Sequence, residues 1–348
     1  MWGNPELRVL DPEDAGEFAA VETFLRQFSL RFDQTLDYTV VLYLDGRIVG
    51  TGSFAGKVIR NIAVLPQYQG EGLTAMLVSS LMQELSRRGV FHYLLFTKPE
   101  RAAQFEALGF SEVARAEPYA VLLETGLYSI SQYCREVAAV AAVLPAGRRA
   151  AVVVNCNPFT LGHRALIERA AVENDAVIVF VVSEDRSLFP FAVRLQLVQA
   201  GVSDLNNVVV VSGGDYSVSQ ATFPTYFSRE SDALPAQTRL DASVFASRIA
   251  PAVGIGLRYV GEEPYCQVTG CYNQSLADIL PRYGIDLRVI ERRSLDGDYI
   301  SASKVREMIR CDDWAAIARV VPASTYAYLR SEAAKPVIAR IKATQSRH

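Results

Sequence analysis

The 348-residue sequence has few of the residues that most often hold a transition metal. It contains three histidines and five cysteines, and no two cysteines stand in a C-x-x-C pair. Structural zinc sites usually take four Cys or His ligands from closely spaced pairs. We therefore assign no metal-ligating residues and expect the cysteines to be reduced structural thiols.

Long apolar runs and an excess of basic residues are also absent. The longest uncharged apolar runs, at 137–144 and 176–182, fall far short of the roughly 20 residues that a membrane helix needs. Residues 1–14 are acidic and have no apolar core, unlike a secretory signal. The 35 Lys and Arg against 38 Asp and Glu provide no basic surface for nucleic acid. We expect a cytoplasmic protein that binds neither membranes nor nucleic acid.

Apolar residues are plentiful enough to build two domains. Half of the chain is hydrophobic, and its length suits two cores of ordinary size. The segment REVAAVAAV followed by Pro-Ala-Gly predicts one packed helix that ends at a domain boundary. We predict an N-terminal domain over 1–125, a linker helix over 126–147 and a C-terminal domain over 148–348.

The N-terminal domain begins with strand signals. Runs at 39–44 and 47–54 are separated by Asp-Gly, which favours a two-residue hairpin turn. A third run, 57–65, leads into PQYQGEGL and then a helical pattern that ends near Gly89. The third strand, the glycine turn and the helix form the first of three candidate phosphate-binding segments.

The glycine turn carries Gln67, Gly70 and Gly72. Glycines let the backbone approach a ligand, and successive N–H groups above a helix N-terminus can hold a pyrophosphate. A tight turn without a ligand is the alternative for Gly-x-Gly alone. With the preceding NIAVLP and the later FEALGF at 105–110, residues 5–125 resemble the GCN5-related acetyltransferase (GNAT) fold.

That resemblance implies a mixed sheet that binds a pantetheine thioester. The pyrophosphate would lie on the amides of 67–72, and the pantetheine arm would lie beside Val64. Phe105 stands where many members of the family have a tyrosine that protonates the leaving thiol, so independent acetyl-CoA transferase chemistry is in doubt. Tyr119 and Glu71 are alternative general acids, or ordinary surface and half-buried residues.

The second half of the chain predicts a different fold. Four short apolar runs alternate with helical patterns, at 150–154, 176–182, 208–211 and 257–260. This alternation favours a doubly wound parallel sheet with its ligand site at the carboxyl ends of the strands. After the first run comes NCNPFTLGH, and helical spacing begins at Gly162. The free N–H groups and the dipole at such a helix N-terminus favour an anion.

Charged residues follow two later strands. Arg186 and Arg194 flank the sequence FPF, and each could pair with a phosphate or a carboxylate, or be a surface arginine. Glu262 and Glu263 follow the run 257–260. They could orient a ribose or Mg²⁺, cap a helix or face solvent.

The third candidate phosphate-binding segment, after the glycine turn and NCNPFTLGH, is ISASKVR, residues 300–306. Ser301 can cap the helix that it opens, and Ser303 and Lys304 lie in the first turn. A lysine there is unfavourable against the helix dipole unless an anion is near. Together, T-x-G-H at 160–163 and I-S-x-S-x-x-R resemble the nucleotidylyltransferase superfamily from residue 148 to about 330.

That resemblance implies a Rossmann-like domain that binds ATP and Mg²⁺. His163 and Thr160 would meet the α-phosphate, while Lys304, Ser303 and the helix N-terminus would hold the β- and γ-phosphates. Further ATP contacts would come from the remaining motif residues and from neighbouring loops, namely Asn157, Phe159, Gly162, Arg194, Glu262, Ser301 and Arg306.

The combination of both halves is more specific. NCNPFTLGHRALIE, FPF before Arg194, GEEPYC and ISASKVR, behind a GNAT-like domain, resemble the citrate lyase ligase family along nearly the whole chain. The resemblance implies an AMP-forming acid–thiol ligase. Acetate and ATP would give acetyl-adenylate and diphosphate, and the acetyl group would pass to the thiol of a phosphoribosyl-dephospho-CoA group on the citrate lyase acyl carrier subunit.

Two alternatives stay open. One is an adenylyltransferase that acts on a phosphorylated nucleophile, with the N-terminal domain as an acyl-CoA sensor. In the other, the N-terminal domain is a docking module for a carrier protein and performs no chemistry.

Overall fold

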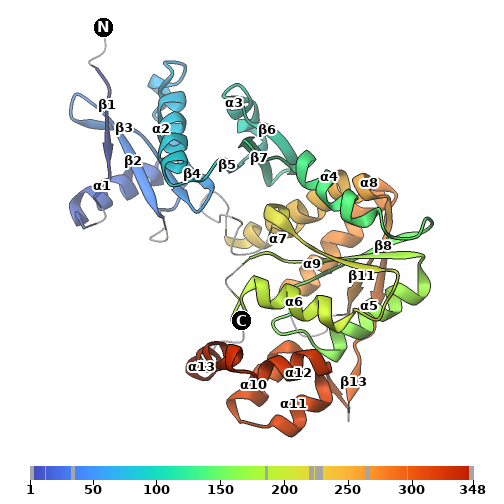
Figure 1. Ribbon diagram of the computed structural model, residues 1–348. Helices are drawn as coiled ribbons and strands as arrows, with labels where there is room; N and C mark the ends of the chain where they lie inside the picture. Colours follow the sequence, from blue (N-terminus) through green and yellow to red (C-terminus); the bar gives the residue numbers. More distant parts are fainter. Residues whose placement is uncertain are drawn as a thin grey trace. The chain divides into compact units, whose positions relative to one another are not determined.

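The computed structural model describes residues 4–344 except 12, 33–35, 185–186, 219–222, 224–229, 263–266 and 296. The chain divides into two compact units (Figure 1). Unit 1 comprises Met1–Gln132 and Phe223–Leu240, and unit 2 comprises Tyr133–Thr222 and Asp241–His348. The division falls inside the segment expected to be a linker helix, and a later segment, 223–240, joins unit 1, which the sequence did not indicate.

Unit 1 is built on a seven-stranded mixed sheet. The strands follow the order β1-β2-β3-β4-β5-β7-β6. Their bounds are β1 Glu6–Val9, β2 Tyr38–Leu44, β3 Arg47–Ala55, β4 Val58–Val64, β5 His92–Thr97, β6 Ser111–Ala116 and β7 Ala120–Gly126. The parallel strands β4 and β5 pair only through Val58 with Leu94 and Ile59 with Leu95, so they part toward their carboxyl ends.

Helices cover both faces of this sheet. They are α1 Ala15–Arg26, α2 Leu73–Arg87 and α3 Ala102–Glu106. Leu77, Leu81 and Leu85 recur every four residues and face the sheet from α2, as one apolar stripe of a helix does. Helix α1 packs on the other face, because its core contains Val41, whereas the α2 core contains Val40 from the same strand.

Unit 2 contains a five-stranded parallel sheet in the order β10-β9-β8-β11-β12. The bounds are β8 Arg149–Val154, β9 Ala176–Val181, β10 Val208–Ser212, β11 Ile255–Gly261 and β12 Asp286–Ile290. The first three strands extend the sheet in one direction and the last two in the other. The crevice at the carboxyl ends of β8 and β11 is therefore the expected ligand site of this topology.

Helices surround this sheet and continue beyond it. Their bounds are α5 Leu161–Glu173, α6 Phe191–Gly201, α8 Ala250–Val253, α9 Gln267–Ile279, α10 Ala302–Arg310, α11 Trp314–Val320, α12 Ala323–Leu329 and α13 Lys335–Ala343. Two more helices, α4 Ile130–Ala141 and α7 Glu230–Val244, cross the division between the units, because residues 130–132 and 230–240 belong to unit 1. A short hairpin, β13 Ser294–Leu295 and β14 Asp298–Tyr299, precedes α10. Figure 1 shows α10–α13 grouped together.

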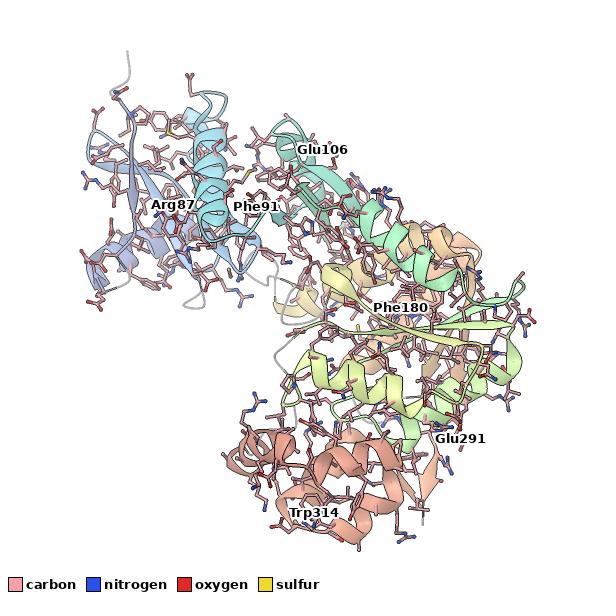
Figure 2. All side chains as sticks on the ribbon, in the orientation of Figure 1. Arg87, Phe91, Glu106, Phe180, Glu291 and Trp314 are labelled. Carbon is pink, nitrogen blue, oxygen red and sulfur yellow. The ribbon has the colours of Figure 1, made fainter. Side chains whose placement is uncertain are left out.

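Both faces of the sheet in unit 2 are buried. Val152 and Val154 of β8 join one core with α5, α6 and the C-terminal helices. On the other face, Phe180 of β9 meets Phe245 edge-on with ring centroids 6.1 Å apart (Figure 2). This double burial explains the continuous apolar runs in the sequence. Within the described ranges, no helix is long and apolar enough to cross a membrane, and Cys134, Cys156, Cys271 and Cys311 form no disulfide bond.

Candidate active site

The N-terminus of α5 carries the T-x-G-H motif. Strand β8 ends at Val154, and the chain turns until Thr160 caps the helix. Thr160 Oγ1 accepts the backbone N–H of His163 at 3.4 Å, and the Thr160 N–H donates to His163 Nδ1 at 3.1 Å. This reciprocal capping box ties the imidazole ring to the first turn of the helix.

The same contacts decide the protonation of His163. Because Nδ1 accepts a backbone N–H, the neutral ring carries its hydrogen on Nε2. The ring also stacks on Phe159, with centroids 6.0 Å apart and planes 16° apart. Burial, and then the positive charge of Arg292, lower the pKa of His163 to about 4. At neutral pH, His163 is thus an uncharged hydrogen-bond donor.

The Phe159 ring packs closely against a glycine of α6. The phenyl ring is fully buried, and a Cβ atom at Gly201 of α6 would collide with it. Phe159 was predicted to contact the nucleotide, but its side chain reaches no solvent. It therefore supports the His163 ring, on which it stacks.

The two motifs meet, although 138 residues separate His163 from Ser301. A Cβ atom at Gly162 would lie 3.0 Å from the carbonyl oxygen of Ile300, so glycine permits this close approach. Arg306 Nη1 donates to the carbonyl oxygen of Asn157 at 2.6 Å. Arg306 is buried, and burial lowers its pKa. Arg306 therefore fastens α10 to the turn before α5.

Helix α10 presents the second motif. Ser301 caps it and accepts the backbone N–H of Lys304 at 3.3 Å, and its hydroxyl lies 3.0 Å from that of Ser303. The anion beside Lys304 is a carboxylate, because Nζ lies 2.9 Å from Asp298 Oδ1 on β14. Both side chains are substantially exposed.

A cavity of about 170 Å³ lies beside the first turns of α10. Ser301, Lys304, Asp298 and Arg319 contribute polar groups to its wall. The rest of its lining is mainly apolar, from Leu295, Tyr299, Ile300, Met308, Ala316 and Val320. A small apolar space with cationic groups at its edge suits part of a nucleotide.

Arg194 lies differently from the expected phosphate ligand. Its side chain is fully buried, and its guanidinium donates to the carbonyl oxygens of Phe189, Asn155, Val182 and Glu184. Arg194 thus joins the loops after β8 and β9 through buried hydrogen bonds. An arginine whose N–H groups serve carbonyl groups in this way positions the site and does not present a free fork to phosphate.

Two further predicted ligands occupy the same edge of the sheet. Asn157 is buried, and its Oδ1 accepts the backbone N–H of Phe189 at 3.1 Å. Glu262 is exposed at the end of β11, where its N–H donates to the carbonyl oxygen of Ile290 at 2.8 Å. Arg186 and Glu263 fall outside the described residues.

Arg292 belongs to this edge and was not singled out from the sequence. It follows β12, and its Nε donates to the carbonyl oxygen of Glu262 at 2.7 Å. After burial, the positive charge of Arg292 is the second cause that lowers the pKa of His163. The only sequence signal was the pair Arg292-Arg293 directly after a strand, and β12 itself was not predicted.

Comparison with known proteins gives this arrangement its family. The family model "Citrate lyase ligase C-terminal domain" matches residues 149–329, more than half of the chain. A [Citrate [pro-3S]-lyase] ligase from Klebsiella pneumoniae is 38% identical over 315 residues, which cover 89% of this chain and 92% of that protein. The chain belongs to the citrate lyase ligase family.

A second relative agrees along the whole length. The [Citrate [pro-3S]-lyase] ligase of Escherichia coli K12 is 34% identical over 337 residues, which cover 95% of each chain. The protein is therefore a ligase, as predicted. The family model "Acetyltransferase (GNAT) domain" matches residues 36–112. This match and the mixed sheet of unit 1 confirm the predicted fold of the N-terminal half.

At the glycine turn of this ligase, no side chain caps the helix that follows. Gly70 and Gly72 have φ angles of 91° and 78°, and Gly72 is the N-cap of α2 with no side-chain cap bond. A Cβ atom at either glycine would meet nothing within 4 Å. Gln67 is exposed beside them, and Val64 is buried at the end of β4.

The remaining residues considered in unit 1 carry no marked chemistry. Phe105 is buried and packs edge-on against Phe110. Glu71 is exposed, and Tyr119 is half-buried with its backbone N–H on the carbonyl of Ala116. Among the described residues, neither side chain has a hydrogen-bond partner that would make it a general acid.

Proposed function

We propose that this ligase uses ATP to acetylate the thiol of a phosphoribosyl-dephospho-CoA group on the acyl carrier subunit of citrate lyase, in the cytoplasm. The carboxylate oxygen of acetate attacks the α-phosphorus, and diphosphate leaves. The thiol sulfur then attacks the acetyl carbon, and AMP leaves as the thiol loses its proton. The observation that carries this proposal is the meeting of His163 and the α10 N-terminus at one sheet edge in a citrate lyase ligase.

In the first step, His163 Nε2–H donates to an oxygen of the α-phosphate. Its Nδ1 is held by the Thr160 backbone, so the ring cannot rotate away without breaking the capping box. The Thr160 hydroxyl lies 2.9 Å from the same Nδ1 atom, and it acts as the second donor when it exchanges that contact for an oxygen of this phosphate. Donors fixed before the reaction stabilise the developing charge without reorganisation.

The β- and γ-phosphates lie at the N-terminus of α10 in this proposal. Ser303 and Lys304 belong to its first turn, where the helix dipole also favours an anion. The exposed pair between Lys304 and Asp298 is worth little, so a polyphosphate can take the place of the carboxylate.

Mg²⁺ suits this arrangement as an ion that arrives with ATP. Over the described ranges, no three His, Cys, Asp or Glu side chains cluster closely enough to hold a metal by themselves. Mg²⁺ commonly keeps waters and takes one or two carboxylates plus phosphate oxygens. The exposed carboxylates of Glu262 and Asp298 would approach it, and the ion would neutralise charge on the leaving diphosphate.

The second step needs a site for the prosthetic arm. We assign the arm to unit 1, with its phosphates on the free amides around Gly70 and Gly72 and its chain beside Val64, where β4 and β5 part. The absence of a tyrosine at Phe105 is compatible with this step. The thiol is the attacking group and must lose a proton, whereas the tyrosine of an acetyltransferase supplies one.

The ligase is distinguished from an adenylyltransferase by exchange of labelled diphosphate into ATP. We expect exchange that depends on acetate and needs no carrier subunit. Exchange that appears only with a phosphorylated nucleophile would overturn the proposal, and a panel of small carboxylates would identify the preferred acid. Family membership favours the ligase.

A docking role for unit 1 is separated by a different pair of measurements. Gly70→Val and Gly72→Val should leave acetate-dependent exchange intact and lower acylation of the carrier thiol. If thiol acylation also survives in both variants, the glycine turn does not bind the arm and unit 1 only docks the carrier.

A further inference from the structure

Arg292 lies at the carboxyl edge of the sheet, where its side chain is hydrogen-bonded to a backbone carbonyl group. It comes two residues after β12 and follows Glu291, which Figure 2 labels, in the sequence. Its Nε donates to the carbonyl oxygen of Glu262 at 2.7 Å, and the Glu262 N–H returns to Ile290 at 2.8 Å. The half-buried Arg292 therefore links the end of β12, which it follows in the chain, to the end of β11, with which its side chain bonds.

A short chain of contacts leads from Arg292 to His163. The carbonyl of the next residue, Arg293, accepts the N–H of Ile300 at 3.0 Å. The carbonyl of Ile300 in turn abuts Gly162, where an added Cβ would be 3.0 Å away. His163 follows Gly162. The segment that carries Arg292 therefore runs beside the N-terminus of α5.

The chemistry proposed for this site calls for a positive charge there. Acetate is already deprotonated, so the oxygen–phosphorus bond can form and the bond to diphosphate can break without a general base. The remaining requirement is to offset negative charge shared by the carboxylate and the phosphate oxygens. His163 donates a hydrogen bond but carries no charge at neutral pH.

We propose that Arg292 is a further catalytic residue whose guanidinium contacts an oxygen of the reacting α-phosphate opposite His163. This inference rests on the proposed ATP site. Two donors, one neutral and one cationic, then hold the phosphoryl group from the α5 side and from the β11–β12 side of the crevice. Burial is the main cause of the lowered pKa of His163, and the positive charge of Arg292 adds to it, so the imidazole is neutral while both groups face one anion.

The test compares Arg292→Gln, Arg292→Lys and Arg293→Gln in acetate-dependent diphosphate exchange by the full chain. Arg293 is the matched control, since its side chain is exposed and only its backbone joins the contacts above. We expect Arg292→Gln to lower kcat on the order of 10²-fold, the scale for one transition-state donor. Arg292→Lys keeps a charge but not the planar fork and should lie between it and the wild type. Arg293→Gln should remain within threefold.

A titration of His163 gives a readout that a structural role would not move. The chain has three histidines, so the imidazole signals can be assigned by NMR with His163→Gln as the reference. We expect the pKa of His163 to rise in Arg292→Gln and to stay unchanged in Arg293→Gln. An unchanged pKa in Arg292→Gln would overturn the proposed juxtaposition.

Kinetics decide between the two anions at the site. A loss in kcat with little change in KM for acetate supports contact with the phosphoryl group. A rise in KM for acetate alone would show that Arg292 binds the acid's carboxylate and would overturn the assignment, as would wild-type activity in Arg292→Gln. Wild-type exchange that ignores acetate would instead defeat the proposed function, whatever Arg292 does.

Discussion

Two helices of this ligase begin after a strand and a turn, and their first turns are built in opposite ways. Helix α5 in unit 2 is capped by the Thr160 side chain, and His163 completes a reciprocal pair of bonds. Helix α2 in unit 1 is capped by Gly72 in a left-handed conformation, with no side-chain bond. Both ends carry the partial positive charge of a helix dipole.

The two helix ends differ in the side chains that a bound ligand would meet. The first turn of α5 contains a titratable ring with a strongly lowered pKa, which is hydrogen-bonded to Thr160 and stacked on Phe159. The first turn of α2 reads LTAM and has no titratable group. A ligand at α2 would meet backbone N–H groups, which can hold a phosphate but cannot respond to a reaction. A ligand at α5 would meet fixed side-chain donors as well.

The comparison predicts its largest effect at His163. We expect His163→Ala to lower acetate-dependent diphosphate exchange on the order of 10²-fold or more, since a preorganised donor is lost. Gly70→Val, at the other helix, should leave exchange unchanged. Exchange within a few-fold of wild type in His163→Ala would remove this residue from the reaction.

A smaller effect is expected at Lys304. Losing a charge-assisted bond to phosphate, worth about 1.5–3 kcal/mol, should weaken ATP binding by roughly 10- to 100-fold in Lys304→Ala, as measured by calorimetry. Asp298→Asn is the matched variant, because it removes only the carboxylate partner. ATP should bind to it as tightly as to wild type or more tightly. Equal weakening in both variants would show that the ion pair itself, and not the lysine, supports the site.

The glycines of the two turns should fail in different ways. Gly162→Ala places a methyl group 3.0 Å from the Ile300 carbonyl, and such overpacking typically costs about 1–3 kcal/mol. We expect lower thermal stability together with slower exchange.

Gly72→Ala has open space around it but must adopt φ near 78°, a strain of about 1–2 kcal/mol. It should lower thiol acylation while exchange persists; a loss of exchange here would erase the distinction between the turns.

The smallest effect concerns pH. The folded protein holds the pKa of His163 at about 4, below the value of about 6.5 for an unfolded histidine. The unfolded state therefore binds the proton first, and this group lowers stability as pH falls from 6.5 to 4. Denaturation of wild type and His163→Gln over that range should show the larger decline in wild type. Parallel curves would contradict the shifted pKa.

The central strands of unit 2 are predictable from sequence because burial on both faces leaves an unbroken apolar run. Strands β8, β9 and β11 lie in the interior of the sheet and follow this rule. Strand β10 is a half-buried edge strand, but its four valines also form an apolar run, and all four strands lie within a few residues of their predicted ranges. Strand β12 escapes it. It is an edge strand that reads DLRVI with Asp286 and Val289 exposed, so its pattern resembles a loop.

Arg194 and Lys304 illustrate where motif chemistry stops being predictive. The type of side chain indicates that each seeks an acceptor, and a nucleotide phosphate is a reasonable expectation. The structure supplies carbonyl groups to Arg194 and a hairpin carboxylate to Lys304. Which acceptor lies within reach depends on loops contributed from elsewhere in the chain, and local sequence does not encode those distances.

The sequence by itself determined the two folds, the family and the residue types at the two helix ends, because periodicity, turn residues and motifs are properties of neighbours along the chain. Only the tertiary structure decided that Gly162 meets Ile300 and that Arg306 reaches the carbonyl oxygen of Asn157. Those facts depend on packing between segments more than 100 residues apart, where a shift of about one ångström changes which groups can bond.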